Sequence, residues 1–125
     1  MSILRNVAVL AFVAFAYGCA SDVARTSAVL ASQPAGDAQR ITVVEDATVR
    51  SSSGYSRTLP AGSTWELRGT LPQGRVYRRV GDVFTVEGAH VHEAYLVVSG
   101  DLLVGYYLPV EQAYSQADPV TLKIK

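Results

Sequence analysis

The 125-residue sequence predicts an all-β fold, a small antiparallel meander or partly closed barrel, preceded by an N-terminal signal helix and a flexible tether. In residues 41–125, β-branched and aromatic residues form short runs separated by Gly, Pro, Ser and Asp, which is typical of such folds. Apolar residues make up 49% of the chain and charged residues 18%, so the chain can bury a core. The net charge of zero gives no reason to expect a nucleic-acid partner.

The N-terminus has the organisation of a secretion signal. Residues 7–17 carry no charge, and this run matches a signal-peptide apolar region but is shorter than the roughly 20 residues of a transmembrane helix. The sequence AYGCAS follows, and it resembles the lipobox of bacterial lipoproteins, in which a small residue precedes an invariant cysteine. Gly18 and Cys19 match these two positions. Ala16 and Tyr17 depart from the leucine and the small residue that are usual before them.

This resemblance implies a lipid-anchored envelope protein. Residues 1–18 would be the signal peptide, and Cys19, the only cysteine, would become the lipidated N-terminus and carry palmitate. Ala20 stands where an aspartate would retain such a lipoprotein in the inner membrane, so the resemblance implies an outer-membrane anchor with the domain in the periplasm. Two alternatives remain open: cleavage after Ala20 to give a soluble periplasmic protein, or retention of the apolar segment as a short anchor.

The segment 19–40 is predicted to be the lipidated cysteine followed by a flexible tether. Ala, Ser, Thr and Gln dominate it, Pro34 and Gly36 interrupt it, and no aromatic residue occurs. Such a composition favours a spacer without a packed structure of its own. Residues 41–125 are therefore expected to form the β-rich domain and to fold alone.

A short internal repeat marks two consecutive units of a turn and a strand. Residues 59–70 and 71–82 both begin with Leu-Pro-x-Gly, a turn signal, and both continue into an aromatic, extended stretch. Alternation places Trp65 and Leu67 on one face of the first strand. Before this repeat, residues 41–49 are expected to form a first strand or strand pair.

Gly81-Asp82 is expected to join two strands in a two-residue hairpin, with Tyr77 opposite Val86. The C-terminal residues 120–125 alternate between apolar and polar side chains, which predicts an edge strand with its lysines in solvent.

A second hairpin, with Gly100-Asp101 as its loop, gives the strongest β signal. Its two strands are apolar on both faces, which predicts a central position in the sheet. In the expected register Val97 faces Val104, and Gly105 suits a site of close packing.

His90 and His92 share one face of a predicted strand, a spacing that occurs in zinc and iron sites. The stretch also resembles part of a cupin motif, because Gly100 follows Glu93 by seven residues. It departs from cupins because Glu93 is adjacent to His92 and therefore points to the opposite face. A metal site would need a third ligand such as Glu45, Asp46 or Glu87, which nothing in the sequence places. We therefore expect no metal, and we expect His92 to tolerate replacement.

No catalytic motif or cofactor-binding motif is present, so the chain is not expected to be an enzyme or to bind a cofactor. Most aromatic residues at strand spacing are expected in the core, but some could line a ligand groove. The candidates for binding are Trp65, Tyr77, Arg78, Tyr106 and Tyr107.

Three functional hypotheses follow. The first is a non-enzymatic envelope lipoprotein, anchored to the membrane through Cys19, whose β-domain binds or scaffolds another envelope component. The second is an SH3-like module that binds peptidoglycan, because residues 47–69 resemble the opening of a bacterial SH3 domain. The third is a His-based metal-binding protein or enzyme. The region 59–109 also resembles small proteobacterial lipoproteins of unassigned function.

Overall fold

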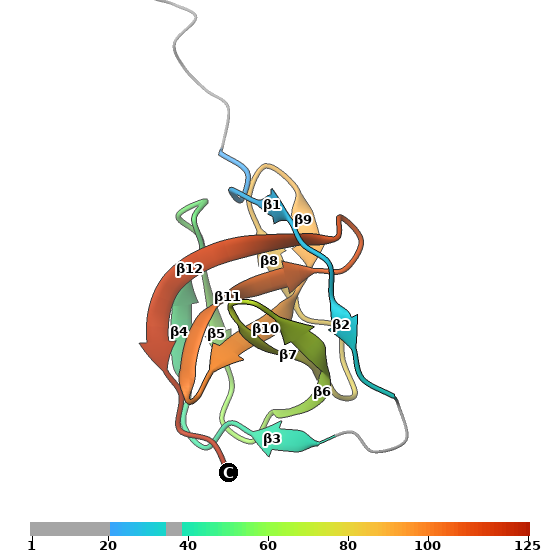
Figure 1. Cartoon of the computed structure of the whole chain (residues 1–125). Helices are drawn as coiled ribbons and strands as arrows, with labels where there is room; N and C mark the ends of the chain where they lie inside the picture. The colour runs from blue at the N-terminus through green and yellow to red at the C-terminus, as the bar shows by residue number, and fades with distance from the viewer. Residues whose placement is uncertain (1–20, 35–38) are drawn as a thin grey trace, which may run out of the picture.

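The structure, a computed structural model, describes residues 21–34 and 39–125 as an assembly of twelve β-strands (Figure 1). In these residues no helix is long and apolar enough to cross a membrane. The predicted signal peptide and Cys19 lie outside the described residues. The strands are β1 (Thr26–Ser27), β2 (Ala31–Ser32), β3 (Arg40–Thr42), β4 (Ala47–Arg50), β5 (Ser56–Leu59), β6 (Thr64–Leu71), β7 (Gly74–Arg79), β8 (Thr85–Glu87), β9 (Val91–Glu93), β10 (Tyr95–Ser99), β11 (Leu102–Leu108) and β12 (Ala113–Thr121).

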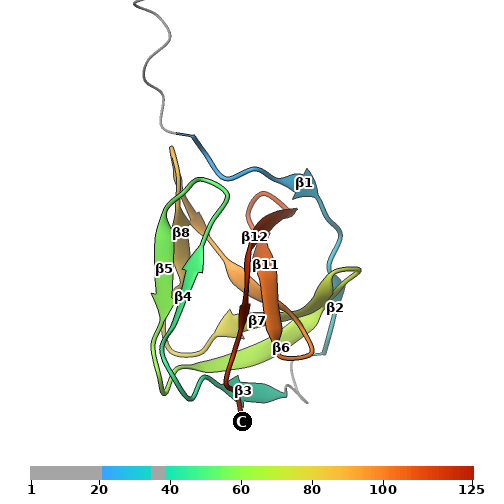
Figure 2. The same cartoon turned by 90° about the vertical axis from the view of Figure 1, so that its left-hand side faces the viewer.

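The strands form one curled antiparallel sheet and two small hairpins. The sheet has the order β1-β12-β11-β10-β7-β6-β2, and β3 pairs with β6 beside β2. The β4–β5 and β8–β9 hairpins stand beside this sheet (Figure 2). The predicted all-β class is therefore confirmed, with a curled sheet that resembles half of a barrel.

The internal repeat forms the β6–β7 hairpin and the turn that leads into it. Trp65 and Leu67 are both buried on the same face of β6, as the alternation predicts. Trp65 packs edge-on against Phe84, with 5.3 Å between the ring centroids. The side chains on the core-facing side of this repeat therefore help to build the main core.

The β10–β11 hairpin has the predicted loop and the predicted central position. Ser99 pairs with Leu102 across Gly100-Asp101, but a bulge shifts the register beyond Val98. As a result Val97 pairs with Gly105 instead of Val104. The prediction is correct at the turn and wrong by one residue beyond the bulge, because a bulge adds one unpaired residue to one strand.

The predicted pairing across Gly81-Asp82 is wrong. β7 pairs with β6 and β10, whereas β8 pairs with β9. Gly81 does turn the chain, with a φ of 81°. After this turn the chain carries Phe84 into the core between Trp65 and Tyr106 and does not return along β7. Both edges of β7 are already paired, so β8 is left to pair with the following strand.

The predicted flexible tether is wrong for residues 21–34, because this segment pairs with both ends of the curled sheet. β1 pairs with β12 at one end, and β2 pairs with β6 at the other. Val23 is buried in the main core. A Cβ atom at Gly69 would overlap the carbonyl oxygen of Ala31, so this glycine allows the segment to approach β6 closely.

Two apolar clusters lie on opposite faces of the curled sheet. The main core includes Trp65, Phe84, Leu96, Tyr106 and Leu108. The second cluster contains Leu71, Val76, Val97 and Tyr107, and Ala28 and Leu30 of the N-terminal segment pack against it. The segment between β1 and β2 therefore helps to cover a core that the predicted domain 41–125 would leave open.

Candidate functional site

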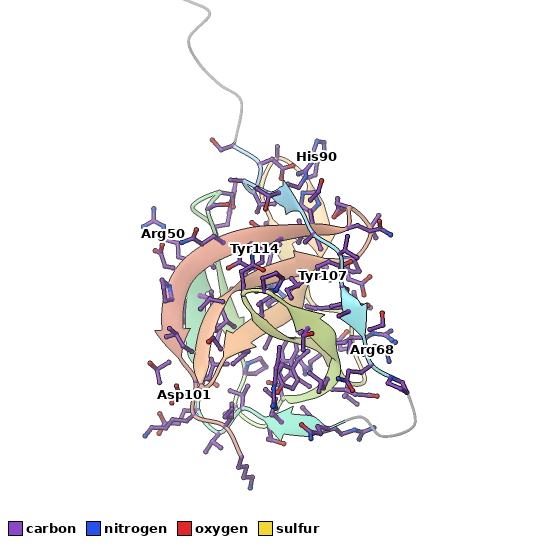
Figure 3. The ribbon with its side chains drawn as sticks, viewed as in Figure 1. Arg50, Arg68, His90, Asp101, Tyr107 and Tyr114 are labelled. Atoms are coloured by element: carbon purple, nitrogen blue, oxygen red, sulfur yellow. The ribbon has the colours of Figure 1, made fainter. Side chains whose placement is uncertain are left out.

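The candidate site is centred on His92 of strand β9. Among the described residues it is the only buried ionisable side chain with hydrogen-bond partners on two sides. Its side chain is 7% exposed. His90 precedes β9 and is exposed at the top of the molecule, where Figure 3 labels it. The two histidine rings have centroids 6.4 Å apart. The prediction that the two histidines share one face of a strand is therefore wrong, because His90 lies before β9 in solvent whereas His92 is buried.

Two carboxylates hold the His92 ring from opposite sides. The Nε2 atom lies 2.9 Å from Asp22 Oδ1, and the Nδ1 atom lies 3.2 Å from Glu111 Oε1. Asp22 also accepts a hydrogen bond from Arg25, with 3.0 Å between Nη1 and Oδ2. Asp22 belongs to the N-terminal segment and Glu111 to the turn between β11 and β12, so His92 joins three distant parts of the chain.

This arrangement favours the protonated imidazole. A neutral ring has one N–H and can donate to one carboxylate only, whereas the imidazolium donates to both. Burial lowers the pKa of His92, but the hydrogen bonds to Asp22 and Glu111 outweigh this effect and raise the pKa above its ordinary value. The hydrogen bond from His92 in turn holds the pKa of Asp22 well below its usual range.

Backbone and hydroxyl groups fix the same segment beside the cluster. Ser115 Oγ donates to the carbonyl of Ala24 over 2.7 Å, and the Ala24 amide donates to Ser52 Oγ over 2.8 Å. The Ala28 amide donates to the carbonyl of Gln112 over 3.0 Å. Gln112 has a φ of 52°, a left-handed conformation that shapes the turn carrying Glu111. Residues 22–28 are thus attached to the domain at several independent points.

The structure brings no metal-ligand set to His92 in the residues it describes. No group of three His, Cys, Asp or Glu side chains there is placed to hold a metal ion. Two residues that the sequence offered as a third metal ligand bond to other groups. Asp46 accepts a hydrogen bond from the Ala61 amide, and Glu45 pairs with Lys123. The geometry is that of a structural ion-pair cluster, and Asp22 and Glu111 are the partners that sequence reasoning missed.

The aromatic binding candidates lie mainly in the cores. Trp65 and Tyr106 are fully buried, and Tyr77 and Tyr107 are almost so. Burial raises the pKa of the Tyr106 hydroxyl, as expected for a phenol removed from water. Arg78 is exposed and borders a shallow depression of about 420 Å³. These residues do not come together in a single groove.

A different, open groove lies between the N-terminal segment and the edge of β12. Its volume is about 560 Å³. Its lining includes Arg25, Gln73, Tyr114, Asp118 and Pro119. The groove offers charges of both signs, the amides of two glutamines and one aromatic ring.

Comparisons with protein-family models, with curated proteins and with solved structures find no match to this chain. The five-stranded closed barrel that would favour an SH3-like module is not the arrangement seen, since the described main sheet has eight strands.

Proposed function

We propose that this chain is a non-enzymatic, lipid-anchored protein of the bacterial cell envelope, held by Cys19 in the outer membrane, whose β-domain binds or scaffolds another envelope component. The observation that carries this proposal is the attachment of Asp22 to His92, immediately after the lipobox-like sequence. A lipid on Cys19 would be followed at once by a segment that is bonded to the domain.

The hydrogen bonds of His92 support a non-catalytic role for this residue. Both ring nitrogens face carboxylates, so neither is free to act as a base toward a substrate or as a metal ligand. The cluster instead joins the N-terminal segment to β9 and to the turn before β12. A protein that transmits position or force between an anchor and a partner needs such an attachment.

The anchor is tested by labelling cells with radioactive palmitate and separating their membranes. We expect the wild-type chain to take up the label and to fractionate with the outer membrane. Cys19→Ala should lose both properties, because the chain has no other cysteine and no long apolar segment remains in residues 20–125. Label that persists in Cys19→Ala, or wild-type protein that is wholly soluble, contradicts the proposal.

The partner of the β-domain is sought by crosslinking in intact cells. A photo-crosslinking residue at Gln73 or Asp118 lies in the open groove, whereas one at Lys125 lies at the C-terminus and serves as the matched control. We expect a discrete crosslinked product from the groove positions only. Identical products from all three positions, or none from any, would argue against a partner at this groove.

A further inference from the structure

The N-terminal segment enters the domain at one end, formed by three turns. Ser21 lines a small depression with Ser53, Gly54 and Tyr55. Asp22 reaches His92 on β9, and the His92 ring reaches the turn before β12. We call this the anchor-side end and define it as residues 51–55, 87–92 and 109–112. It lies at the top of Figure 1, opposite the C-terminus.

The distance between a lipid on Cys19 and this end is short. Three residue steps separate Cys19 from Asp22, and at about 3.8 Å per step they span no more than about 11 Å. The reach expected of a flexible tether over residues 19–40 is therefore not available, because the chain is bonded to the domain from Asp22 onward. An anchored domain would be held with this end close to the lipid headgroups.

Exposed apolar side chains gather at the same end. Val91 precedes His92, Val110 precedes Glu111, and Val29 follows Ala28, which is bonded to the same turn. Three of the six exposed large apolar residues in the described chain belong to the anchor-side end: Tyr55 (45% exposed), Val91 (66%) and Val110 (77%). A fourth, Val29 (91%), lies outside it, between β1 and β2. A single exposed apolar residue is ordinary, whereas three at the end where the chain enters the domain indicate a contact surface.

The other two exposed apolar residues lie at the far end of the molecule. The Val44 amide donates to the carbonyl of Lys123, near the C-terminus. Val83 comes three residues after Val80, whose amide donates a hydrogen bond to the carbonyl of Thr64 at the start of β6. Figure 3 labels His90 at the anchor-side end and Asp101 toward the far end. Val83, 58% exposed, is therefore a matched control for Val91.

The charged residues at the anchor-side end do not favour binding to an anionic membrane. Asp22 and Glu111 are paired with His92, and Asp22 with Arg25. Glu87 is exposed on β8, so the free charge is not predominantly positive. Attraction to acidic lipids needs clustered Lys and Arg, which are not found here. Contact with a bilayer would depend on the apolar side chains and on the anchor.

We propose that the anchor-side end lies directly on the surface of the membrane, with Tyr55, Val91 and Val110 at the boundary between headgroups and acyl chains. The occupant of this surface is a lipid bilayer of zwitterionic headgroups. The proposal rests on the proposed lipid anchor and deepens it by assigning the orientation of the domain. The far end, with Val83 and the C-terminus, then points away from the membrane.

The test uses the full-length lipidated protein, purified and reconstituted into phosphatidylcholine vesicles. Val91→Cys and Val83→Cys are each labelled with an environment-sensitive fluorophore, and nitroxide lipids in the same vesicles serve as quenchers. We expect several-fold stronger quenching and a blue-shifted emission at position 91, and the emission of a water-exposed probe at position 83. Equal quenching at the two positions, or stronger quenching at 83, overturns the proposal.

Wild-type protein separates this outcome from a failure of the anchor. Its only thiol is Cys19, so a lipidated chain takes up no fluorophore and floats with the vesicles. A wild-type chain that reacts or does not float contradicts both proposals. A chain that floats unlabelled, with no difference between positions 91 and 83, contradicts the orientation alone. Val110→Asp, an exposed change, should reduce quenching at 91 without releasing the chain from the vesicles.

Discussion

The β10–β11 hairpin and the N-terminal segment 21–34 belong to the same curled sheet but are held by different means. The hairpin lies in the middle of the sheet, with most of its side chains buried. The segment contributes two strands of two residues each, and all four residues are exposed. It is attached instead through Val23, through backbone hydrogen bonds and through the Asp22–His92 pair.

The difference teaches where β-structure gets its stability. In the hairpin, cross-strand pairing and burial act on the same residues, so local sequence and final structure agree. In the segment, β1 and β2 pair with short stretches of β12 and β6, and a few separate contacts hold the segment on the domain. Such a segment is ordered by the rest of the domain and has little structure of its own.

The largest expected effect comes from removing the segment. Residues 39–125 should be less stable than residues 20–125 by at least about 3 kcal/mol, because Val23 and part of Leu30 lose their buried sites and two sheet edges lose their partners. Urea denaturation followed by circular dichroism measures the difference. This expectation replaces the sequence-based one, in which residues 41–125 fold alone.

Val23→Ala in residues 20–125 is the control for that truncation, because it removes only the core contact. It should account for roughly 1–2 kcal/mol of the loss. If residues 39–125 and 20–125 unfold at the same urea concentration, the segment is not part of the folded unit and does not stabilise the sheet.

The sequence predicted those parts of the fold whose signals are local. The Leu-Pro-x-Gly turns, the Trp65 face of β6 and the loop at Gly100-Asp101 each depend on neighbouring residues, and all three are confirmed. The bulge beyond Val98 and the pairing of β8 with β9 depend on what else occupies the sheet. No pattern of turns and alternation contains that information.

Gly105 in the hairpin and Gly69 beside the N-terminal segment both lie at sites of close packing, and the same substitution at each should have different effects. A Cβ atom at Gly105 would lie 2.5 Å from the Ser115 carbonyl oxygen and 2.7 Å from Tyr114 Oη, so Gly105→Val should destabilise the whole domain by roughly 2 kcal/mol or more. Gly69→Val should mainly push the Ala31 backbone off β6. Urea midpoints measure the first effect, and amide exchange of residues 28–34 measures the second.

Val83→Ala, an exposed change, should stay within about 0.5 kcal/mol of wild type. If Gly69→Val unfolds the domain as strongly as Gly105→Val does, the segment and the hairpin form one cooperative unit. The atoms that a side chain at Gly105 would meet belong to β12.

The His92 cluster could be predicted only in part. The sequence identified His92, but Asp22 lies 70 residues away and Glu111 lies 19 residues away in a turn. The sequence therefore did not predict the buried ion pairs around His92. A lone acidic residue in a polar segment gives no signal of its partner, because the pairing requires the whole sheet to be in place.

The smallest expected effect is a pH dependence of docking, and it tests whether the segment is held by the ion pairs. The folded-state pKa of His92 is raised above 6.5, so its contribution to docking is fully present below pH 6.5 and is lost as the pH rises through the raised value. The pKa of Asp22 is lowered, so its contribution is present above pH 3.8 and is lost as the pH falls below that. Docking should therefore be strongest between about pH 4 and pH 6.5.

The methyl resonances of Val23 report the docked population, since this side chain is buried only when the segment is in place. We expect docking to weaken above pH 6.5 by less than about 1 kcal/mol, because the two carboxylates are partly solvated. His92→Asn should remove the change on the alkaline side, whereas His90→Ala should keep it, because the His90 ring is exposed and bonded to neither carboxylate. A pH profile that is the same in His92→Asn and wild type would mean that Val23 and the backbone bonds alone hold the segment, and that the imidazolium adds nothing to the attachment.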